Sequence, residues 1–207
     1  AKVPVTVTVS ACNVPAPTVT STIEYCQGAT ATALTATGSN LKWYTTATGG
    51  TPTTVAPTPS TTTVGSTTYY VSQTTTCESP RAAIIVTIKA VPSAPTAGSN
   101  SPICAGSTLN LTASNITGAT YAWSGPASFT NTTQNPSRTN ATTAMSGTYS
   151  VTATVNGCTS TAGTVAVTVN AIPAAPTAGS NSPICAGATL NLTASNITGA
   201  TYAWSGP

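Results

Sequence analysis

Residues 92–126 read PSAPTAGSNSPICAGSTLNLTASNITGATYAWSGP, and residues 173–207 repeat them as PAAPTAGSNSPICAGATLNLTASNITGATYAWSGP. Only two positions differ, and both are exchanges of Ser for Ala. The two copies are 81 residues apart (Cys104 to Cys185), and a looser copy around Cys26 precedes the first by 78 residues. Solenoid repeats have periods of about 20–50 residues, so this longer period predicts one small domain per copy.

The repeat divides the chain into four segments. We predict that residues 16–91 and 92–172 are two complete domains, that 1–15 holds the last strand and linker of a preceding domain, and that 173–207 is the first half of a further repeat. The first segment is assigned because KVPVTVTVSA near the N-terminus matches GTVAVTVNA at 163–171. The junctions contain prolines, which stiffen a short spacer. We expect the sequence to be a part of a longer secreted polypeptide.

Alternating apolar and polar residues predict β-strands throughout, because successive side chains of a strand point to opposite faces. Gly and Pro, 16 of each, interrupt the pattern at regular points. The spacing predicts an all-β Greek-key sandwich with about seven strands per domain and a Trp on the third strand. The expected core residues are Leu109, Leu111, Ala113, Tyr121, Trp123, Tyr149, Val151, Ala153, Val155, Val165, Val167 and Val169, with Leu41, Trp43, Ile84, Val86 and Ile88 in the earlier domain.

One predicted strand, over residues 29–38, has an ambiguous register. Ala31 and Ala33 would lie on one face, whereas Leu34 and Ala36 would lie on the other. A β-bulge would reconcile the two faces, because it inserts one extra residue into a strand.

Composition narrows the class of protein. Charged residues make up 3% of the chain, whereas Thr makes up about a quarter, which predicts a neutral, Thr-coated surface. No apolar run reaches the roughly 18 residues that a membrane helix needs, so we expect no membrane insertion. The net charge of +3 comes from scattered residues, and nucleic acids or anionic lipids would need clustered Lys and Arg. Six cysteines indicate an oxidising, extracellular compartment.

The residues that carry most enzyme chemistry are missing. The chain has no His, and its only acidic residues are Glu24 and Glu78. A Ser-His-Asp relay, a carboxylate pair or a calcium site therefore cannot be assembled, and the cysteines lack zinc-site spacing. We predict that the protein is not an enzyme and has no catalytic residues, no cofactor and no metal site.

Several sequence motifs resemble a known family. SPICAGSTLNLTAS, YAWSGP, MSGTYSVTATVNGC and GTVAVTVN resemble the immunoglobulin-like (PKD-like) repeats of giant surface adhesins from gliding bacteroidete-type bacteria. WYTTATGGTP, at 43–52, resembles a sister immunoglobulin-like repeat of the same proteins. The resemblance implies tandem immunoglobulin-like domains arranged head to tail, export by type IX secretion, a bacterial cell-surface location, and a part in adhesion or gliding motility.

The cysteines allow two pairing schemes. Within one domain, Cys26 would pair with Cys77 and Cys104 with Cys158. In a sandwich, however, the two members of each pair lie at opposite poles, roughly 25 Å apart for a strand of about eight residues. A disulfide needs Cα atoms within about 7 Å. We therefore favour bridges between neighbouring domains, while a distorted first strand or last turn would leave the pairing within each domain open.

The scheme between domains uses all six cysteines as structural disulfide residues. Cys26 would join Cys158, and Cys12 would lie beside Cys77. Cys104 would join a cysteine in the later part of the next repeat. Cys185 corresponds to Cys104 in that repeat. Such bridges would fix the angle between neighbours.

The leading hypothesis for function is a structural stalk segment of a long surface adhesin or filament. Its partners would be the neighbouring repeats of the same chain, with lateral self-association into a filament as a further expectation and the distal ligand unknown. The alternative is a polysaccharide-binding accessory module of a secreted enzyme, which needs exposed aromatic residues. Tyr44, Tyr70 and Phe129 are its candidates, whereas Trp43, Trp123 and Trp204 are expected in the core. Thr rows such as 61–63 and 74–76 would suit ice binding, but a period near 80 residues gives no flat array.

Overall fold

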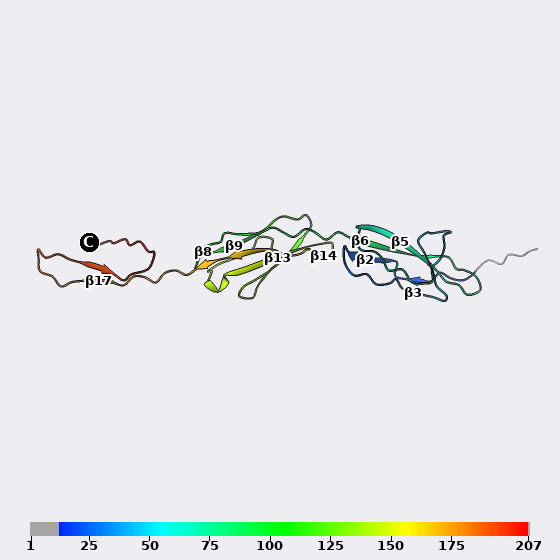
Figure 1. Ribbon diagram of the computed structural model, residues 1–207, viewed down its shortest axis with the longest axis horizontal. Helices are drawn as coiled ribbons and strands as arrows, with labels where there is room; N and C mark the ends of the chain where they lie inside the picture. Colours follow the sequence, from blue (N-terminus) through cyan, green and yellow to red (C-terminus); the bar gives the residue numbers. More distant parts are fainter. Residues whose placement is uncertain (1–12, 207) are drawn as a thin grey trace, which may run out of the picture.

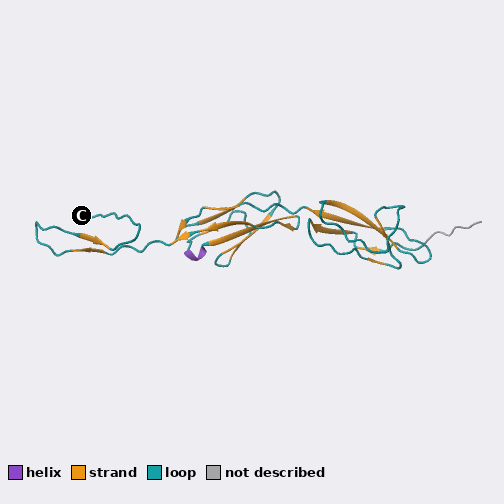
Figure 2. Cartoon of the chain, viewed as in Figure 1, coloured by secondary structure: helices purple, strands orange, loops and turns teal. Residues whose placement is uncertain are grey.

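The computed structural model describes residues 13–206, and almost all of their regular structure is β-strand (Figure 2). The described residues form three parts that follow one another along the long axis of the molecule (Figure 1). We call them the first unit (residues 16–91), the second unit (92–172) and the third unit (173–207). Residues 1–12, where the strand of a preceding domain is predicted, lie outside the described residues.

The first unit contains six strands in two sheets. They are β1 (Thr18–Val19), β2 (Thr22–Cys26), β3 (Ala36–Thr37), β4 (Lys42–Tyr44), β5 (Gly65–Ser72) and β6 (Ala82–Lys89). One sheet has the order β2-β6-β5-β4, with β2 parallel to β6, and the other pairs β1 with β3. The core between them consists of Leu34, Trp43, Val71, Ile84, Val86 and Ile88. The predicted alternation of Ile84, Val86 and Ile88 is confirmed, because all three are buried on one face of β6.

The ambiguous stretch over residues 29–38 is mostly irregular, and its prediction as a long strand was wrong. Only Ala36–Thr37 pair as a strand, and Leu34 is buried immediately before them. No bulge is required, because the chain reaches the Leu34 face without first forming a strand. The Leu34 amide instead donates to the Pro57 carbonyl at 2.9 Å.

The second unit is a more complete sandwich. Its elements are β7 (Ala97–Ser99), β8 (Ile103–Cys104), β9 (Leu109–Ala113), β10 (Thr120–Gly125), β11 (Phe129–Asn131), β12 (Ser137–Arg138), a 3-10 turn (Thr143–Met145), β13 (Gly147–Val155), β14 (Cys158–Thr159), β15 (Gly163–Val167) and β16 (Val169–Asn170). One sheet contains β11, β10, β13, β14 and β15, and the opposite sheet has the order β12-β9-β7. The core consists of Leu109, Leu111, Ala113, Tyr121, Trp123, Ala141, Tyr149, Val151, Ala153, Val167 and Val169.

The predicted last strand of the second unit is split into β15 and β16. Thr168 interrupts it, because the Thr168 carbonyl accepts from the Ile103 amide and the Thr168 amide donates to Ser101 Oγ at 2.7 Å. After this break, β16 pairs with β8 in parallel rather than with β13. Val167 and Val169 are buried as predicted, whereas Val165 is only half-buried.

The third unit shows how much of the fold is local. Its strands β17 (Ala178–Ser180) and β18 (Leu192–Ala194) pair like β7 and β9. Leu192 is nevertheless 52% exposed, although its copy Leu111 is fully buried. Trp204, expected in the core, is 51% exposed, whereas Trp123 is 2% exposed. The reason is that β13 and β15, which lie across the core in the second unit, have no counterpart among the described residues of the third.

Candidate functional site

The junction between the first and second units brings together residues that are far apart in the sequence. On the first unit, β2 ends at Cys26 and β6 ends at Lys89, and the parallel register places these two residues side by side. The Gln27 amide continues the pairing by donating to the Lys89 carbonyl at 2.8 Å. The chain therefore leaves the first unit directly beside Cys26.

On the second unit, a tight hairpin turn presents Cys158 to the junction. Asn156 and Gly157 separate the paired residues Val155 and Cys158, and both have positive φ, 51° and 84°. Positive φ at both central residues suits a two-residue hairpin turn, and Asn-Gly is the sequence that adopts it most readily. The turn places β14 at the end of the second unit that faces β2 and β6 (Figure 1).

Cys26 and Cys158 form a disulfide that crosses the junction. Their sulfur atoms are 2.03 Å apart, their Cα atoms are 5.6 Å apart, and they are separated by 132 residues in the sequence. The predicted bridge between neighbouring units is therefore confirmed for this pair. The alternative pairing of Cys104 with Cys158 is wrong, because Cys104 is a free, exposed thiol.

A polar contact lies next to the disulfide. Lys89 Nζ lies 2.5 Å from Glu24 Oε2 and 3.3 Å from the Asn156 carbonyl oxygen of the second unit. The ammonium group thus connects a carboxylate of one unit to the turn that carries Cys158. An ion pair this exposed contributes at most about 1 kcal/mol, so its main effect is to orient the two surfaces.

The linker at 90–96 is itself held against the second unit. Pro95 is buried, and its carbonyl oxygen lies over Gly163 at the start of β15. A Cβ atom at residue 163 would lie 1.8 Å from that oxygen, so only glycine fits there. The C-terminal end of the linker is therefore fixed against β15, and the part of the linker that is free to move is shorter than the sequence suggests.

The same cysteine positions recur in both units. Cys104 lies beside Asn170 in the parallel pairing of β8 with β16, as Cys26 lies beside Lys89. At the other pole, Cys158 lies two residues before Ser160, whose hydroxyl accepts from the Ala153 amide at 3.0 Å. Each unit therefore carries one cysteine at the end where the chain leaves and one at the opposite end.

In the first unit, Cys77 takes the place of Cys158. It lies two residues before Ser79, whose hydroxyl accepts from the Gln73 amide at 3.0 Å. Cys77 is disulfide-bonded, but its predicted neighbour Cys12 lies outside the described residues, so that pairing stays a prediction. Cys185, the copy of Cys104, is free and exposed.

The turn that carries Cys77 is organised by Glu78. Its carboxylate accepts hydrogen bonds from the Tyr44 hydroxyl and, at 2.7 Å, from the Ser72 hydroxyl, and Lys42 Nζ lies 3.3 Å away. These hydrogen bonds, with the positive charge of Lys42 adding to them, lower the pKa of Glu78 to about 2. The carboxylate thus stays ionised well below its usual range and holds the loop against β4 and β5.

Two of the three aromatic candidates for polysaccharide binding are covered by neighbouring side chains. Tyr44 was expected to be exposed, and this was wrong: it is 5% exposed, and the Arg81 guanidinium lies 3.3 Å from its ring centre. Phe129 packs edge-on against Tyr149, with ring centres 5.5 Å apart. Tyr70 is half-buried.

Arg138 also covers Phe129, with the guanidinium 4.7 Å from its ring centre. Sequence reasoning missed this residue, together with Arg81, Lys89 and Gly163, because their partners are distant in the sequence. A local signal was present only for the Asn-Gly turn before Cys158.

The described part of the chain contains no group of three or more His, Cys, Asp or Glu side chains arranged to hold a metal ion. Over the same residues, no helix has the length and apolar character that crossing a membrane requires.

Comparisons with known proteins bear on the fold and the compartment. Residues 15–89 match the family described as "Ig-like domain CHU_C associated". A search of curated proteins found no match. The match over residues 15–89 and the two-sheet strand arrangement show an all-β, immunoglobulin-like fold. Together with the disulfide, the match indicates an extracellular protein.

Among solved structures, the chain is similar to the N-terminal four Ig domains of Dscam1 isoform 7.44, with 11% identity and a TM-score of 0.30 over 79% of this chain and 47% of that chain. It is also similar to the amphioxus IgVJ-C2 molecule, with 15% identity and a TM-score of 0.33 over 70% of this chain and 99% of that chain. The chain spans about half the length of the Dscam1 chain.

Proposed function

We propose that this chain is a structural segment of a long, repetitive stalk on a bacterial cell surface, in which immunoglobulin-like domains follow one another head to tail and carry a distal adhesive tip. The domains are residues 16–91 and 92–172, flanked by parts of two further repeats at 1–15 and 173–207. Type IX secretion is the export route that fits the resemblance of the repeats, and a role in gliding or static adhesion follows from the same resemblance. An immunoglobulin-like domain of this family suits a non-catalytic module.

The observation that carries the proposal is the Cys26–Cys158 disulfide beside the linker. A single flexible linker lets two domains bend and twist in every direction. A second covalent connection at the same junction removes most of that freedom, because the domains can then only hinge about the line through both connections. The Lys89 contact to the Asn156 carbonyl and the buried Pro95 restrict the hinge further. Such a junction suits a spacer that must keep its reach.

The proposal extends to the next junction by symmetry. Cys104 lies where Cys26 lies, next to the residue at which the chain leaves its unit. A further complete repeat would present its own hairpin cysteine to Cys104, so each junction of the stalk would carry one bridge. The pairing of Cys12 with Cys77 would be the preceding bridge of the same series.

Lateral self-association of such stalks is a second part of the proposal. Only 3% of the residues are charged, so neighbouring chains would meet little electrostatic repulsion. Sedimentation velocity over a wide range of concentrations measures this directly, and a strictly monomeric chain throughout would remove the lateral filament while leaving the stalk intact.

The stalk proposal is tested by small-angle X-ray scattering of the oxidised chain and of a Cys26→Ser/Cys158→Ser variant. We expect the oxidised chain to fit one fixed arrangement of the first two units, and the variant to require a broad set of orientations. A Cys104→Ser/Cys185→Ser variant is the matched control, because it removes two cysteines without touching the bridge. Free rotation between the first two units in the oxidised chain would overturn the proposal.

A further inference from the structure

The second unit closes the edge of one of its sheets with two carboxamide side chains. On β9, the Ala113 amide donates to Asn135 Oδ1 at 3.0 Å, and the Ala113 carbonyl accepts from Gln134 Nε2 at 2.9 Å. The core residue Trp123 donates from its indole nitrogen to the Gln134 carbonyl oxygen at 3.2 Å. Consecutive Gln and Asn residues thus satisfy both backbone groups of Ala113 on β9 and the indole of Trp123 on β10.

The first unit has the same edge without these two residues. Leu34 donates to the Pro57 carbonyl as Leu111 donates to the Pro136 carbonyl, each at 2.9 Å, so the two edges are in the same register. Ala36 therefore takes the place of Ala113. Ala36 is also opposite Val19 as Ala113 is opposite Ala97, so the Ala36 amide and carbonyl correspond to those that Gln134 and Asn135 bind in the second unit.

The loop that could cover this edge is shorter in the first unit. Trp43 pairs with Thr53, and Trp123 pairs with Asn131, so both loops start from the same point. Three residues (54–56) then precede Pro57, whereas four (132–135) precede Pro136. Val55 and Ala56 replace the Gln-Asn pair, and Val55 is 74% exposed.

The first unit lacks the hydrogen bonds that close this edge in the second unit. No side chain among the described residues bonds to the backbone of Ala36, and within the same residues the Trp43 indole nitrogen makes no hydrogen bond. Trp123 and Ala113, their counterparts, are fully bonded at the same positions. These groups line an open cleft, and among the described residues the Trp43 indole nitrogen is not a buried atom without a partner. Water can therefore bond to them, and a ligand gains binding energy by replacing that water with fixed hydrogen bonds.

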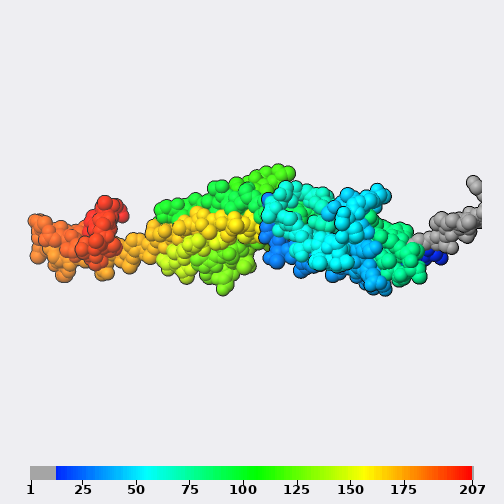
Figure 3. All heavy atoms as spheres, turned by 45° about the vertical axis from the view of Figure 1, so that its right-hand side comes forward, coloured from blue at the N-terminus to red at the C-terminus, as the bar shows by residue number. Residues whose placement is uncertain are grey.

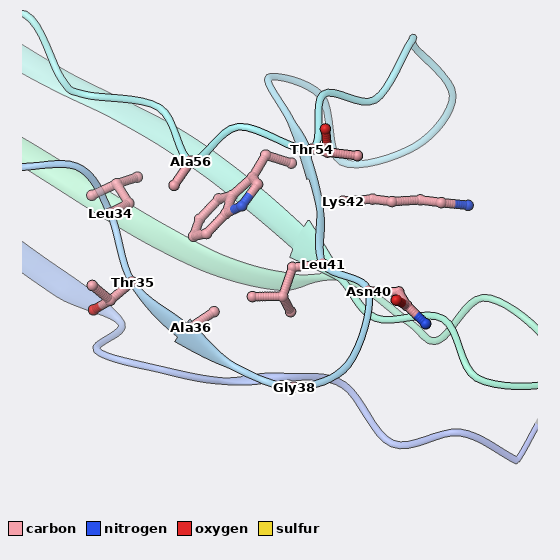
Figure 4. Close-up of a pocket in the computed structure, with 10 residues that line it drawn as sticks. Leu34, Thr35, Ala36, Gly38, Asn40, Leu41, Lys42, Thr54 and Ala56 are labelled. Atoms are coloured by element: carbon pink, nitrogen blue, oxygen red, sulfur yellow. The ribbon is translucent and has the colours of Figure 1, made fainter.

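A cleft lies at this position. It has a volume of about 690 Å³ and is lined by Ala36, Leu41, Lys42, Trp43, Thr54 and Ala56, among others. In Figure 4, Thr54 and Lys42 lie on one side of the cleft, and Leu34, Thr35 and Ala36 lie on the other, where β3 begins. The cleft takes the place that Gln134 and Asn135 fill in the second unit.

We propose that the cleft of the first unit binds an extended peptide segment of a partner polypeptide that presents adjacent Gln and Asn residues, and so completes the edge that the second unit completes from its own chain. A carboxamide is required because it both donates and accepts, whereas a carboxylate only accepts and cannot satisfy the Ala36 carbonyl. The partner's backbone carbonyl would accept from the Trp43 indole nitrogen. This inference is independent of the stalk proposal, because the cleft lies beside β3, away from the junction where β2 meets β14 (Figure 1).

The test uses the chain as it stands and the acetylated, amidated peptide Thr-Thr-Gln-Asn-Pro-Ser, which copies residues 132–137. The measurement is a ¹H–¹⁵N NMR titration of the three indole signals, with Thr-Thr-Glu-Asp-Pro-Ser as the matched control peptide. We expect the Trp43 indole signal to shift on adding the Gln-Asn peptide, those of Trp123 and Trp204 to stay unchanged, and the control peptide to bind at least tenfold more weakly. Equal binding of both peptides, or no shift of the Trp43 signal, would overturn the proposal.

A loop exchange provides the second arm. Replacing residues 54–56 with Thr-Thr-Gln-Asn should let the first unit close its own edge, move the Trp43 indole signal in the absence of peptide, and abolish peptide binding. Unchanged peptide affinity in this variant would contradict the proposed site. A chitin trisaccharide tests whether the site takes a sugar in place of a peptide, because its acetamido groups are also amides. If the sugar shifts the Trp43 signal and the peptide does not, the peptide assignment is overturned.

Discussion

The two junctions that the described residues contain in full, after the first unit and after the second, begin alike and end differently. In both, the chain leaves its unit next to a cysteine on the neighbouring parallel strand, Cys26 beside Lys89 and Cys104 beside Asn170. At the first junction the cysteine is bonded across to the next unit, whereas at the second Cys104 is free. In Figure 3 the first two units are in contact, and a thin neck connects the third.

The difference comes from the receiving side. Cys158 belongs to the hairpin of β13 and β14, late in its unit, so a junction is closed only by the C-terminal half of the unit that follows. The prolines of the linkers show the same dependence: Pro95 is buried under β15, whereas its copy Pro176 is exposed. The first half of a unit, nearly identical in both copies, therefore does not close a junction by itself; the later strands that carry the hairpin cysteine do.

Removing the disulfide should lower the free energy of unfolding more than any other change considered, because the first junction then has no covalent bridge, like the second. For the sequence separation of 132 between Cys26 and Cys158, the chain-entropy model gives a stabilisation of up to about 5 kcal/mol. We expect the Cys26→Ser/Cys158→Ser variant to lose much of this free energy of unfolding, measured by denaturant titration. The Cys104→Ser variant should stay within about 0.5 kcal/mol of the parent, as exposed substitutions usually do. Equal losses in both variants would mean that the bridge plays no special part.

Displacing the linker from β15 should cause the next largest loss of stability. Gly163→Ala places a methyl group against the Pro95 carbonyl, so either the linker or β15 must move, at a cost of about 1–3 kcal/mol. Gly98→Ala is the control, because its added methyl meets only the hydroxyl of Thr112, which can rotate away. Thermal unfolding of the two variants measures the difference. A Gly163→Ala variant as stable as Gly98→Ala would show that the linker is not seated on β15.

The smallest expected effect is on the pH dependence of stability, which should differ between the first and second units. The lowered pKa of Glu78 stabilises the first unit fully above pH 4.5, and that stabilisation is lost as the pH falls from 4.5 toward about 2. The second unit contains no Asp or Glu, so its stability should not fall in this range. Amide hydrogen exchange of each unit between pH 5 and 2 would show the contrast, and Glu78→Gln should remove it. If both units lost the same stability between pH 5 and 2, this assignment to Glu78 would be contradicted.

The sequence predicted the parts of the fold that follow from local patterns and from topology. Alternation identified Leu111, Trp123 and Val151 as core residues, because burial on one face of a strand leaves a period of two. The bridge between Cys26 and Cys158 followed from the poles at which strands end, even though the two residues are distant in sequence.

What the sequence did not predict depends on contacts that no period encodes. Tyr44 follows the inward-facing Trp43 and was expected to be exposed, but Arg81 and Glu78 cover it from the loop between β5 and β6. Residues 29–33 alternate Ala and Thr as a strand would, but they form no strand. The cleft beside Ala36 has no local signal in the first unit, where the loop at 54–56 is one residue shorter than its counterpart at 132–135.

Pulling on the chain would load two neighbouring strands of the first unit at once. Tension passes out through β6 into the linker, and also through β2 into the disulfide, and these strands are hydrogen-bonded to each other along their whole shared length. A unit held by one strand end can be peeled apart one hydrogen bond at a time. When β2 and β6 are pulled together from the same side, they move as one piece. Their hydrogen bonds would then have to break together, so the sheet would resist a higher force.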